Sequence, residues 1–447
     1  MPEESVEQLI VHEASLRFFP SFLKDHPEAR LYMVGGAVRD AILGRKTKDF
    51  DFVIAGVPAK DLERWFAKHG SMDLTGRNFG VYKFLPHGSL EKTFVDIALP
   101  RTEQATEGSL GGYKDFETQS DAQLDITTDL ARRDFTINAM AYDVRGMRLV
   151  DPYGGLEDLK SKTIRAVGDA ARRFREDLSR ILRAIRFASE LAFFIEPHTW
   201  EALRKTVPLL NITRARADGV TQFVVPRETI GKELAKALAA NPQRTLEMLR
   251  TSGIFSFVLP EVQQSLERDR NFLAPILSYE DGPLPVTLTL LLRDTDPSRI
   301  GHILQRVGLT SLPLFSPLRV EAEDIAWLVR TLKSDEALHA DSIRASQFER
   351  LFMTPRGTFL KEALRRLEKH SLLDTIKQRE EKIWDHWQLD EEKRIPNLVS
   401  GSDVLDLGVA PGPRVRELLS RVRDAQLEGR IKTHAEALRL LSQLVKE

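Results

Sequence analysis

The sequence predicts an α+β protein in which a small mixed head precedes a long, mostly α-helical remainder. β-rich runs alternate with short helical segments up to about residue 150, and apolar residues recur at helical spacing from about residue 155 onward. The 447 residues are enough for about two to four domains. We therefore expect a head at 1–153, a helical neck at 154–265, a helical body at 266–395 and a helical tail at 396–447.

Composition narrows the possible functional classes. The chain contains no cysteine, which excludes disulfides, zinc–thiolate sites and thiol catalysis and is compatible with a reducing cytoplasm. No apolar run reaches the length needed to cross a bilayer, and the N-terminus is acidic, unlike a targeting signal. We expect a cytoplasmic protein that does not bind a membrane. The 65 basic and 66 acidic residues nearly balance, but phosphate binding depends on where charges cluster.

Within the first 150 residues, five apolar runs bounded by glycine, proline or charged turns read as strands. They are LYMVGG, DFDFVIAG, VYKFLP, TFVDIAL and AMAYDV. Between Arg101 and Asp129 the chain is polar, lacks clear periodicity and is long for a plain connection. This stretch predicts a functional, mobile loop.

The first of these strands ends in a pair of glycines. Gly35 and Gly36 permit a tight turn, and a helix expected to begin near Ala37 presents unpaired N–H groups that can bind a phosphate. Arg39, one turn into that helix, can add a charge-assisted contact. A turn without a ligand is the alternative reading of the same pattern.

Two carboxylates follow in the second strand. Alternation along a strand puts Asp49 and Asp51 on one face and Phe50 on the other, toward the core. Two adjacent acids repel each other unless a cation lies between them, so the pair is a candidate Mg²⁺ site that bridges nucleotide phosphates. Asp96, centred in TFVDIAL, is a candidate third carboxylate that helps to activate a hydroxyl. The alternatives are a solvated strand end and a strand-edge acid.

A second set of charged residues recurs at helical spacing. Asp177, Arg180, Arg183 and Arg186 are three residues apart, which predicts that they share one face of one helix. An Asp–Arg pair offers an acceptor beside a forked donor and so matches the amino group and ring acceptors of cytosine and adenine. Uracil and guanine present a carbonyl and a ring N–H instead, and would leave buried groups unsatisfied. A charged, solvated helix face is the alternative.

Several ordered blocks resemble one enzyme family. The blocks are GGAVRD with DFDFVI, RRDFTINAMAYD, and REDLSRILRAIRF. They are similar to motifs of the class II tRNA nucleotidyltransferases, or CCA-adding enzymes, and of the bacterial poly(A) polymerases. The resemblance implies a polymerase-β-like nucleotidyltransferase head that uses Mg²⁺. It also implies template-independent addition of C and A to the 3′ end of tRNA, with ATP, CTP and the tRNA acceptor end as partners, and no DNA.

The resemblance also implies roles for individual residues. Asp49 and Asp51 would bind metal, and Asp96 would join them in catalysis. Gly35, Gly36 and Arg39 would hold the triphosphate, Arg133 and Asp134 the ribose, and Asp177 and Arg180 the base, with Arg183 and Arg186 nearer the triphosphate. In the tail, PGPRVRELL starts a helix on which Arg414 and Arg416 would contact RNA phosphates; a helix–turn–helix in the core is an equal alternative.

Three alternatives stay open within this resemblance. The chain could add only A to tRNA, act as a poly(A) polymerase, or be an RNA-binding protein with an inactive head. The long loop after Arg101 argues against an enzyme that adds only C, and Asn78 and Gly80 in GRNFGVYKF argue against a poly(A) polymerase. The intact pair of acids in DFD argues against an inactive head.

Overall fold

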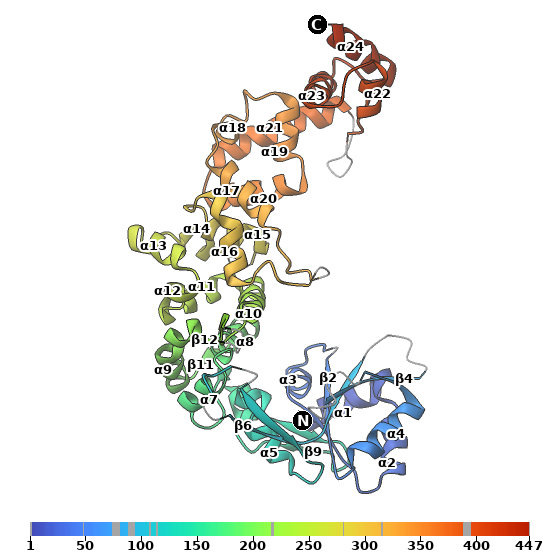
Figure 1. Cartoon of the computed structure of the whole chain (residues 1–447), viewed down its shortest axis with the longest axis vertical. Helices are drawn as coiled ribbons and strands as arrows, with labels where there is room; N and C mark the ends of the chain where they lie inside the picture. Colours follow the sequence, from blue (N-terminus) through green and yellow to red (C-terminus); the bar gives the residue numbers. More distant parts are fainter. Residues whose placement is uncertain are drawn as a thin grey trace. The chain divides into compact units, whose positions relative to one another are not determined.

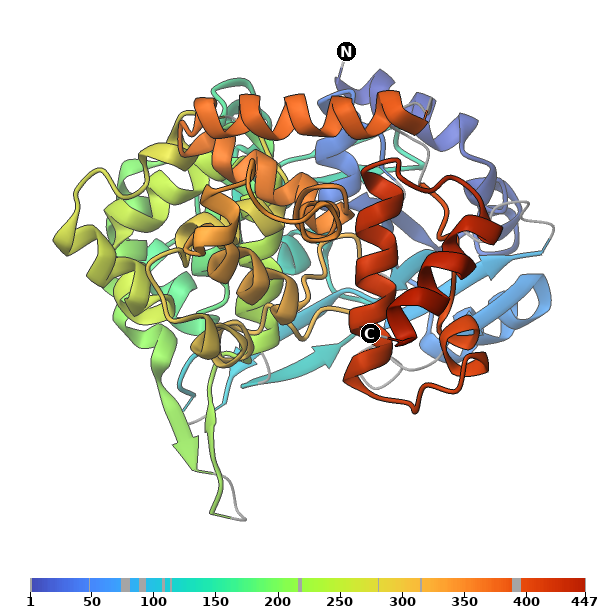
Figure 2. The same cartoon turned by 90° about the horizontal axis from the view of Figure 1, so that it is seen from above.

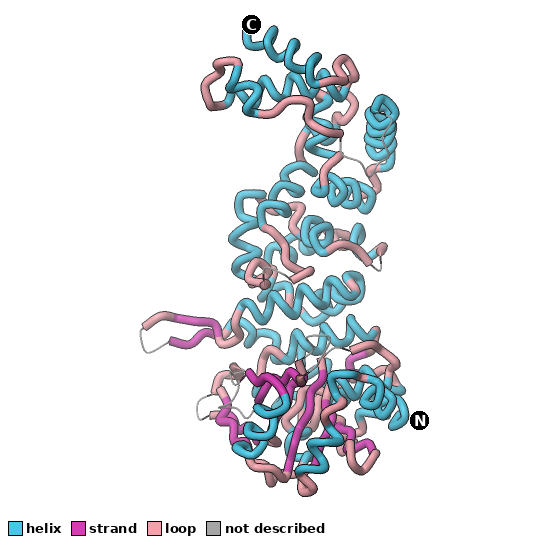
Figure 3. Tube along the Cα trace, turned by 90° about the vertical axis from the view of Figure 1, so that its right-hand side faces the viewer, coloured by secondary structure: helices cyan, strands magenta, loops and turns pink. Residues whose placement is uncertain are grey.

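The computed structural model describes residues 2–47, 49–73, 81–87, 94–106, 109–112, 115–215, 219–279, 281–313, 316–387 and 395–446. The chain divides into two compact units (Figure 1), one formed by Met1–Asn241 with Glu247–Val258 and the other by Pro242–Leu246 with Leu259–Glu447. Every described strand belongs to the first unit, and the described part of the second unit consists of helices and loops (Figure 3). The α+β class is thus confirmed. The boundaries between the four expected domains stay a prediction, and Asn78 and Gly80 lie outside the described residues.

A seven-stranded mixed sheet forms the core of the head, in the order β3-β4-β5-β2-β1-β8-β9. β2 and β5 run parallel, and the other neighbouring strands are antiparallel. The five strands predicted from the sequence are β1, β2, β4, β5 and β8, whereas β3 and β9 were not predicted. The bounds are β1 Arg30–Val34, β2 Phe50–Ala55, β3 Gly70–Asp73, β4 Val81–Pro86, β5 Val95–Ala98, β8 Ala141–Asp143 and β9 Arg148–Val150.

The two faces of this sheet differ in character. On one face, Phe52 packs against Phe19 of helix α2 (Phe19–Asp25) with ring centroids 4.4 Å apart, and helix α4 (Ala59–His69) extends this aromatic core. Alternation along β2 turns Asp51 and Val53 to the opposite face, where Val53 packs with residues of α5 (Ile126–Ala131). The expectation that Phe50 points into the core is confirmed, since its side chain is buried.

The polar stretch after Arg101 is more regular than its sequence indicated. β6 (Arg101–Ala105) and β7 (Phe116–Ser120) pair antiparallel as a separate two-stranded sheet, and α5 follows. The expectation of a stretch without regular structure was therefore wrong at both of its ends. The ladder uses backbone groups, so it forms without the apolar alternation that reveals a half-buried strand.

Around the neck the described chain folds into helices with two small two-stranded sheets. The expected single helix through REDLSRILRAIRF is wrong, because α7 (Ala170–Glu176) ends at Glu176 and α8 (Arg180–Leu191) starts at Arg180.

β12 (Thr213–Ala215) and β13 (Thr221–Phe223) form a hairpin that projects from the surrounding helices (Figures 2 and 3). The remaining elements of the first unit are α1 Pro2–His12, η1 Ala14–Leu16, α3 Gly36–Ile42, η3 Thr136–Asn138, α6 Gly155–Lys160, β10 Thr163–Ile164, α7 Ala170–Glu176, α8 Arg180–Leu191, β11 Phe194–Ile195, α9 Pro197–Thr206, η4 Val207–Asn211, β12 Thr213–Ala215, β13 Thr221–Phe223, α10 Arg227–Ala240 and α12 Phe255–Val258, with α11 Pro242–Ser252 shared between the units.

Among the described residues of the second unit, one apolar core surrounds Phe348 and Phe352 and another surrounds Leu418 and Leu441. None of the described helices is both long enough and apolar enough to span a bilayer. The helices of this unit are α13 Pro260–Arg268, α14 Ala274–Leu277, α15 Leu284–Leu291, η5 Pro297–Arg299, α16 Ile300–Val307, α17 Ala322–Leu332, α18 Asp335–Leu338, α19 Ala345–Phe352, α20 Pro355–Arg366, α21 His370–Trp387, α22 Gly401–Asp406, α23 Pro413–Leu427 and α24 His434–Lys446.

Candidate active site

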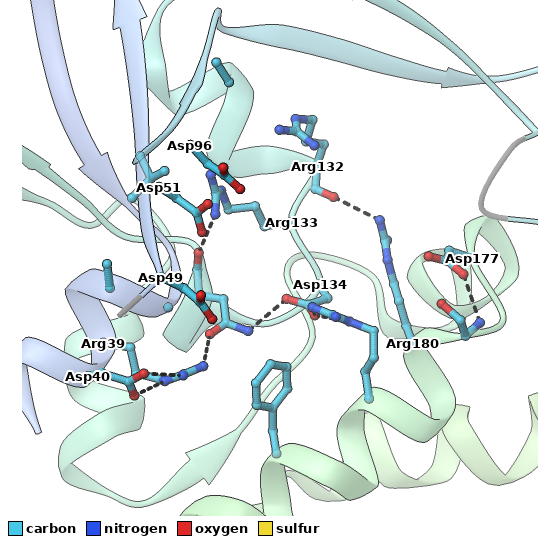
Figure 4. A pocket seen from close by; sticks show the side chains of 18 of the residues that line it. Arg39, Asp40, Asp49, Asp51, Asp96, Arg132, Arg133, Asp134, Asp177 and Arg180 are labelled. Atoms are coloured by element: carbon cyan, nitrogen blue, oxygen red, sulfur yellow. Dashed lines mark hydrogen bonds and ion pairs between the residues drawn. The ribbon is translucent and has the colours of Figure 1, made fainter. Parts of the chain in front are cut away.

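A cavity of about 750 Å³ lies between the sheet of the head and helices α8 and α10, within the first unit (Figure 4). It brings together residues that are far apart in the sequence. Among the predicted site residues, those that line it are Gly36, Arg39, Asp49, Asp51, Asp96, Arg133, Asp134, Asp177, Arg180, Arg183 and Arg186. Gly35 is adjacent in the chain. Arg414 and Arg416 belong to the second unit, where Arg416 lines a separate cavity of about 460 Å³ and Arg414 donates to the carbonyl of Val445.

The glycine turn determines how closely an arginine can approach the strand end. Gly35 has a φ of +71°, and a Cβ built on it would lie 2.5 Å from Nη1 of Arg133. The backbone conformation therefore favours glycine, and any larger residue would displace the end of the Arg133 side chain. Helix α3 starts at Gly36, and its Arg39 is buried with three of the five guanidinium donors already used. Nη1 donates to Asn138 at 2.7 Å, and Nε and Nη2 each donate to Asp40 at 2.9 Å.

Three carboxylates meet on the face of the sheet opposite the aromatic core. Asp51 of β2 is the direct cross-strand partner of Asp96 on β5, and Asp49 immediately precedes β2. Burial raises the pKa of Asp51; Arg133 opposes this effect, whereas Asp96 and Asp49 add to it. Asp96 also accepts from Nζ of Lys83 at 3.0 Å, in an ion pair that is largely exposed. An exposed pair of this kind is worth little and exchanges easily.

The donor set of this cluster fits a magnesium ion. Mg²⁺ prefers oxygen ligands, keeps several waters and is commonly held by one or two carboxylates together with substrate phosphates. Asp49 and Asp51 supply two such carboxylates. Burial raises the pKa of Asp51, and a bound cation would stabilise the charged form of its carboxylate. Among the described residues, no three His, Cys, Asp or Glu side chains are arranged to hold a metal by themselves. Substrate oxygens would have to complete the coordination.

Arg133 is held at the site by a buried network that the sequence did not reveal. Asp129, fully buried on α5, accepts from Arg133 at 3.2 Å and from Arg132 at 2.8 Å. Arg132 also donates to Glu103 of β6 at 2.7 Å. The network therefore ties the β6–β7 pair to the residues that precede Asp134. No local pattern could have identified Glu103 as its member, because it lies 29 residues from Arg132.

Asp134 is saturated with hydrogen bonds inside the protein. Its Oδ1 accepts from the backbone of Phe135 at 2.8 Å and from Asn138 at 3.1 Å, and its Oδ2 accepts from Nε and Nη2 of Arg183 at 2.8 and 2.5 Å. Burial alone would raise the pKa of Asp134, but Arg183 and Asn138 outweigh burial and hold the pKa well below its usual range. To accept a bond from a ribose hydroxyl, the role that the family resemblance implies, Asp134 would have to exchange one of these four hydrogen bonds.

We expect Asp134→Ala to lower the free energy of unfolding by about 3 kcal/mol, because it leaves Arg183 without its buried partner. Urea denaturation measures this loss, with the exposed Asp61→Ala as a control that should stay within about 0.5 kcal/mol of wild type. Because the pKa of Asp134 is depressed, its contribution is fully present above an unfolded-state pKa of about 4 and is lost as the pH falls below it. A gap between wild type and variant that grew as the pH fell below 4 would contradict this assignment.

Asp177 and Arg180 line the cavity together, although not in the way expected. Asp177 is an extended residue between α7 and α8, and its Oδ1 accepts from the backbone N of Ser179 at 2.9 Å. This local bond competes with helix formation, which explains the break after Glu176. Arg180, the first residue of α8, donates to the carbonyls of Arg132 at 3.0 Å and Arg173 at 3.2 Å. The prediction that Asp177 and Arg180 share one helix face was therefore wrong.

Arg183 and Arg186 follow Arg180 on α8 at the predicted spacing, and they meet residues of α10. Arg186 donates to Glu190 of its own helix at 2.7 Å and to Glu233 of α10 at 2.5 Å. Its guanidinium also lies 4.0 Å from the ring centroid of Phe187. The lining residues Phe187, Glu233 and Lys236 were not anticipated. Thr229, Glu233 and Lys236 are four and three residues apart, so they share one face of α10, and this face lines the cavity. This helical spacing is visible in the sequence and could have identified them.

The ion pairs of the cavity divide its charged residues into two groups. All of the lining arginines are paired with carboxylates; they are Arg39, Arg101, Arg132, Arg133, Arg180, Arg183 and Arg186. Within the part of the chain that the structure describes, three lining carboxylates form no ion pair, namely Asp49, Asp51 and Asp177. Negative charge without a partner is thus concentrated at the strand end and at the break between α7 and α8.

Comparison with known proteins gives consistent relatives. Residues 31–165 match the family model described as the poly A polymerase head domain. A multifunctional CCA protein from Nitrosomonas europaea is 36% identical over 332 residues, which cover 68% of this chain and 74% of that protein. Another from Xylella fastidiosa is 38% identical over 235 residues, covering 52% of this chain and 50% of that protein. The chain thus spans about half the length of the Xylella relative.

Solved structures share the fold over nearly the whole chain. A Bacillus stearothermophilus CCA-adding enzyme in complex with CTP superposes with a TM-score of 0.67 at 23% identity, covering 100% of this chain and 98% of that one. A Thermotoga maritima CCA-adding enzyme complexed with tRNA gives a TM-score of 0.61 at 23% identity, covering 98% of each chain. The motifs, the head-domain match and the identity to the Nitrosomonas protein together establish that this chain belongs to the family of the multifunctional CCA proteins, with a poly(A) polymerase-type head.

Proposed function

We propose that this protein adds C and A nucleotides from CTP and ATP to the 3′ end of tRNA. The observation that carries the proposal is the set of unpaired carboxylates in one cavity. Two of them, Asp49 and Asp51, lie at the strand end, and the third, Asp177, lies beside Arg180. A metal-assisted phosphoryl transfer needs the first pair, and the choice of an amino-bearing base needs the third. The names of the relatives from Nitrosomonas and Xylella support the same activity.

The reaction is an in-line displacement at the α-phosphorus of the nucleotide. The 3′ oxygen of the RNA forms a bond to that phosphorus while the bond to the β-phosphate oxygen breaks, and pyrophosphate leaves. Mg²⁺ held by Asp49 and Asp51 would supply the charge that stabilises both oxygens. Asp96 is the candidate acceptor of the hydroxyl proton, because its exposed ion pair with Lys83 exchanges easily.

Choice of the base is proposed to depend on Asp177 and Arg180. Asp177 uses one oxygen for Ser179, so the other is available to accept from the amino group of cytosine or adenine. Arg180 is buried and held by two backbone carbonyls, which preorganises its guanidinium to donate to the ring acceptors. A fixed acceptor beside a fixed donor rejects uracil and guanine, whose groups are reversed. The loss of the shared helix face does not affect this argument, since both residues line the same cavity.

The other predicted contacts are proposed as follows. Gly35, Gly36 and Arg39 bind the triphosphate with Arg183 and Arg186 close by, and Arg133 with Asp134 positions the ribose. In the second unit, Arg414 and Arg416 are proposed to contact tRNA backbone phosphates; Arg416 lines a cavity there, which supports an exposed role. We further propose that the protein acts in the cytoplasm, the compartment that its lack of cysteine fits.

The decisive experiment offers three tRNA substrates, ending at the discriminator base, at C and at CC, with CTP or ATP alone and then together. We expect CTP to extend the first two substrates and ATP to extend only the CC-ended one, so that all three reach CCA. Extension of only the CC-ended substrate would mean an A-adding enzyme, and long A tails on unrelated RNA would mean a poly(A) polymerase. No extension with any substrate in the presence of Mg²⁺ would favour an RNA-binding protein with an inactive head.

A further inference from the structure

One cation in the cavity differs from all the others. Every lining arginine is paired with a carboxylate, whereas Lys236 of α10 forms no ion pair or hydrogen bond within the described residues. Its side chain is half-buried. Burial of an ammonium group removes part of its hydration, and Glu233 and Glu190 offset this only in part, so an anionic ligand in the cavity would stabilise the charged form of Lys236.

The surroundings of Lys236 strengthen this argument. Burial lowers the pKa of Lys236, and the neighbouring cations Arg186 and Lys232 lower it further. The nearby carboxylates Glu190 and Glu233 are both occupied by Arg186, at 2.7 and 2.5 Å. The local excess of charge is therefore positive, and it lies in a cavity rather than on an open surface.

The position of Lys236 identifies which part of a ligand it would meet. Arg186, its neighbour, lies six residues from Arg180 along α8, a separation of about 9 Å along the helix axis. The guanidinium groups of Arg186 and Arg39 lie 4.0 and 5.1 Å from the ring centroid of Phe187, so this end of the cavity adjoins the glycine turn. Lys236 is therefore at the end opposite the base-reading pair of Asp177 and Arg180.

We propose that Lys236 binds the triphosphate of the incoming nucleotide, as an anion site that sequence motifs did not include. The inference deepens the proposed function, because it assumes that a nucleotide occupies the cavity with its base near Asp177. A point-charge ammonium on a flexible stem suits a phosphate that shifts during transfer, whereas the paired arginines are fixed by their carboxylates. Because the contact is to phosphate, Lys236 serves CTP and ATP equally.

The test compares Lys236→Gln with Lys232→Gln, which removes an exposed charge one turn away on the same helix and outside the cavity lining. Binding of inorganic triphosphate, measured by calorimetry, is expected to weaken about tenfold in Lys236→Gln and to stay unchanged in Lys232→Gln, as for loss of one charge-assisted hydrogen bond. Lys236→Arg should restore most of the binding. Thermal unfolding of all three variants should stay close to wild type, because neither lysine forms an ion pair or hydrogen bond with the residues that the structure describes.

Steady-state kinetics show whether Lys236 binds the phosphates of the nucleotide or those of the tRNA backbone. For Lys236→Gln we expect the KM values for CTP and ATP to rise by the same factor, with the KM for tRNA unchanged. A rise in the KM for tRNA with normal triphosphate binding would assign the group to the RNA backbone and overturn the proposal, as would unchanged values throughout. The experiment on triphosphate binding does not depend on extension of tRNA. Its result can therefore be interpreted even if the protein does not extend tRNA.

Discussion

The double variant Asp49→Asn with Asp51→Asn is expected to lose nucleotide addition by about a thousandfold or more, while it still folds. The metal ion that these residues are proposed to hold contributes several kcal/mol to the transition state, and each 1.36 kcal/mol changes the rate about tenfold. Burial raises the pKa of Asp51, so its charged form is disfavoured in the folded protein and a neutral isostere should not destabilise it. Single-turnover incorporation of CTP into tRNA with saturating Mg²⁺ measures the effect.

Two controls separate loss of chemistry from loss of structure. Asp61→Asn removes an exposed carboxylate of the same head and should retain full activity. Thermal unfolding of the double variant should occur at or above the wild-type temperature. If the double variant folded normally and still extended tRNA at the wild-type rate, the assignment of these two acids to catalysis would be wrong.

For Asp177→Ala we expect a change in which nucleotide is added rather than an end to transfer. Removing the acceptor costs CTP and ATP one hydrogen bond and relieves the repulsion that excludes the carbonyl of uracil. Each unsatisfied buried group is worth about 1–3 kcal/mol, so the preference for CTP over UTP should fall by about 10- to 100-fold. Competition between CTP and UTP, read from the kcat/KM values on tRNA lacking its CCA end, measures the change.

The matched control is Asp169→Ala. Asp169 caps α7 by accepting from the backbone of Arg172 at 2.6 Å, much as Asp177 accepts from Ser179, but it does not line the cavity. It should lose some stability, as expected for a helix cap, and keep its nucleotide preference. If Asp177→Ala kept wild-type selectivity for CTP over UTP, Asp177 would be a capping residue only and the base-reading proposal would be wrong.

Features that depend on neighbouring residues could be predicted from the sequence. The alternation in DFDFVIAG placed Phe50 in the core and set Asp51 on the opposite face, because side chains on a strand alternate whatever the strand pairs with. The glycine pair after the first strand likewise predicted a turn, which the φ of +71° at Gly35 confirms. The five patterned strands and the helical remainder followed from periodicity alone.

The end of helix α7 could not be predicted from the sequence. The spacing of Asp177, Arg180 and Arg183 fits one continuous helix, and apolar periodicity carries no mark of the break. The break depends on a bond between the Asp177 side chain and the Ser179 backbone, whose alternative, a helical turn, has a similar local energy.

The partners that lie far apart in the sequence were decided by the tertiary structure alone, whereas pairs such as Arg186 with Glu190 follow helical spacing. Arg183 pairs with Asp134 across 49 residues, and Arg186 pairs with Glu233 across 47. Nothing in the local sequence indicates that these arginines find carboxylate partners whereas Lys236 forms no ion pair with any residue that the structure describes. Backbone conformation and side-chain alternation act over a few residues and can be read from sequence, whereas the strength of an ion pair depends on burial and distance, which exist only once the chain has folded.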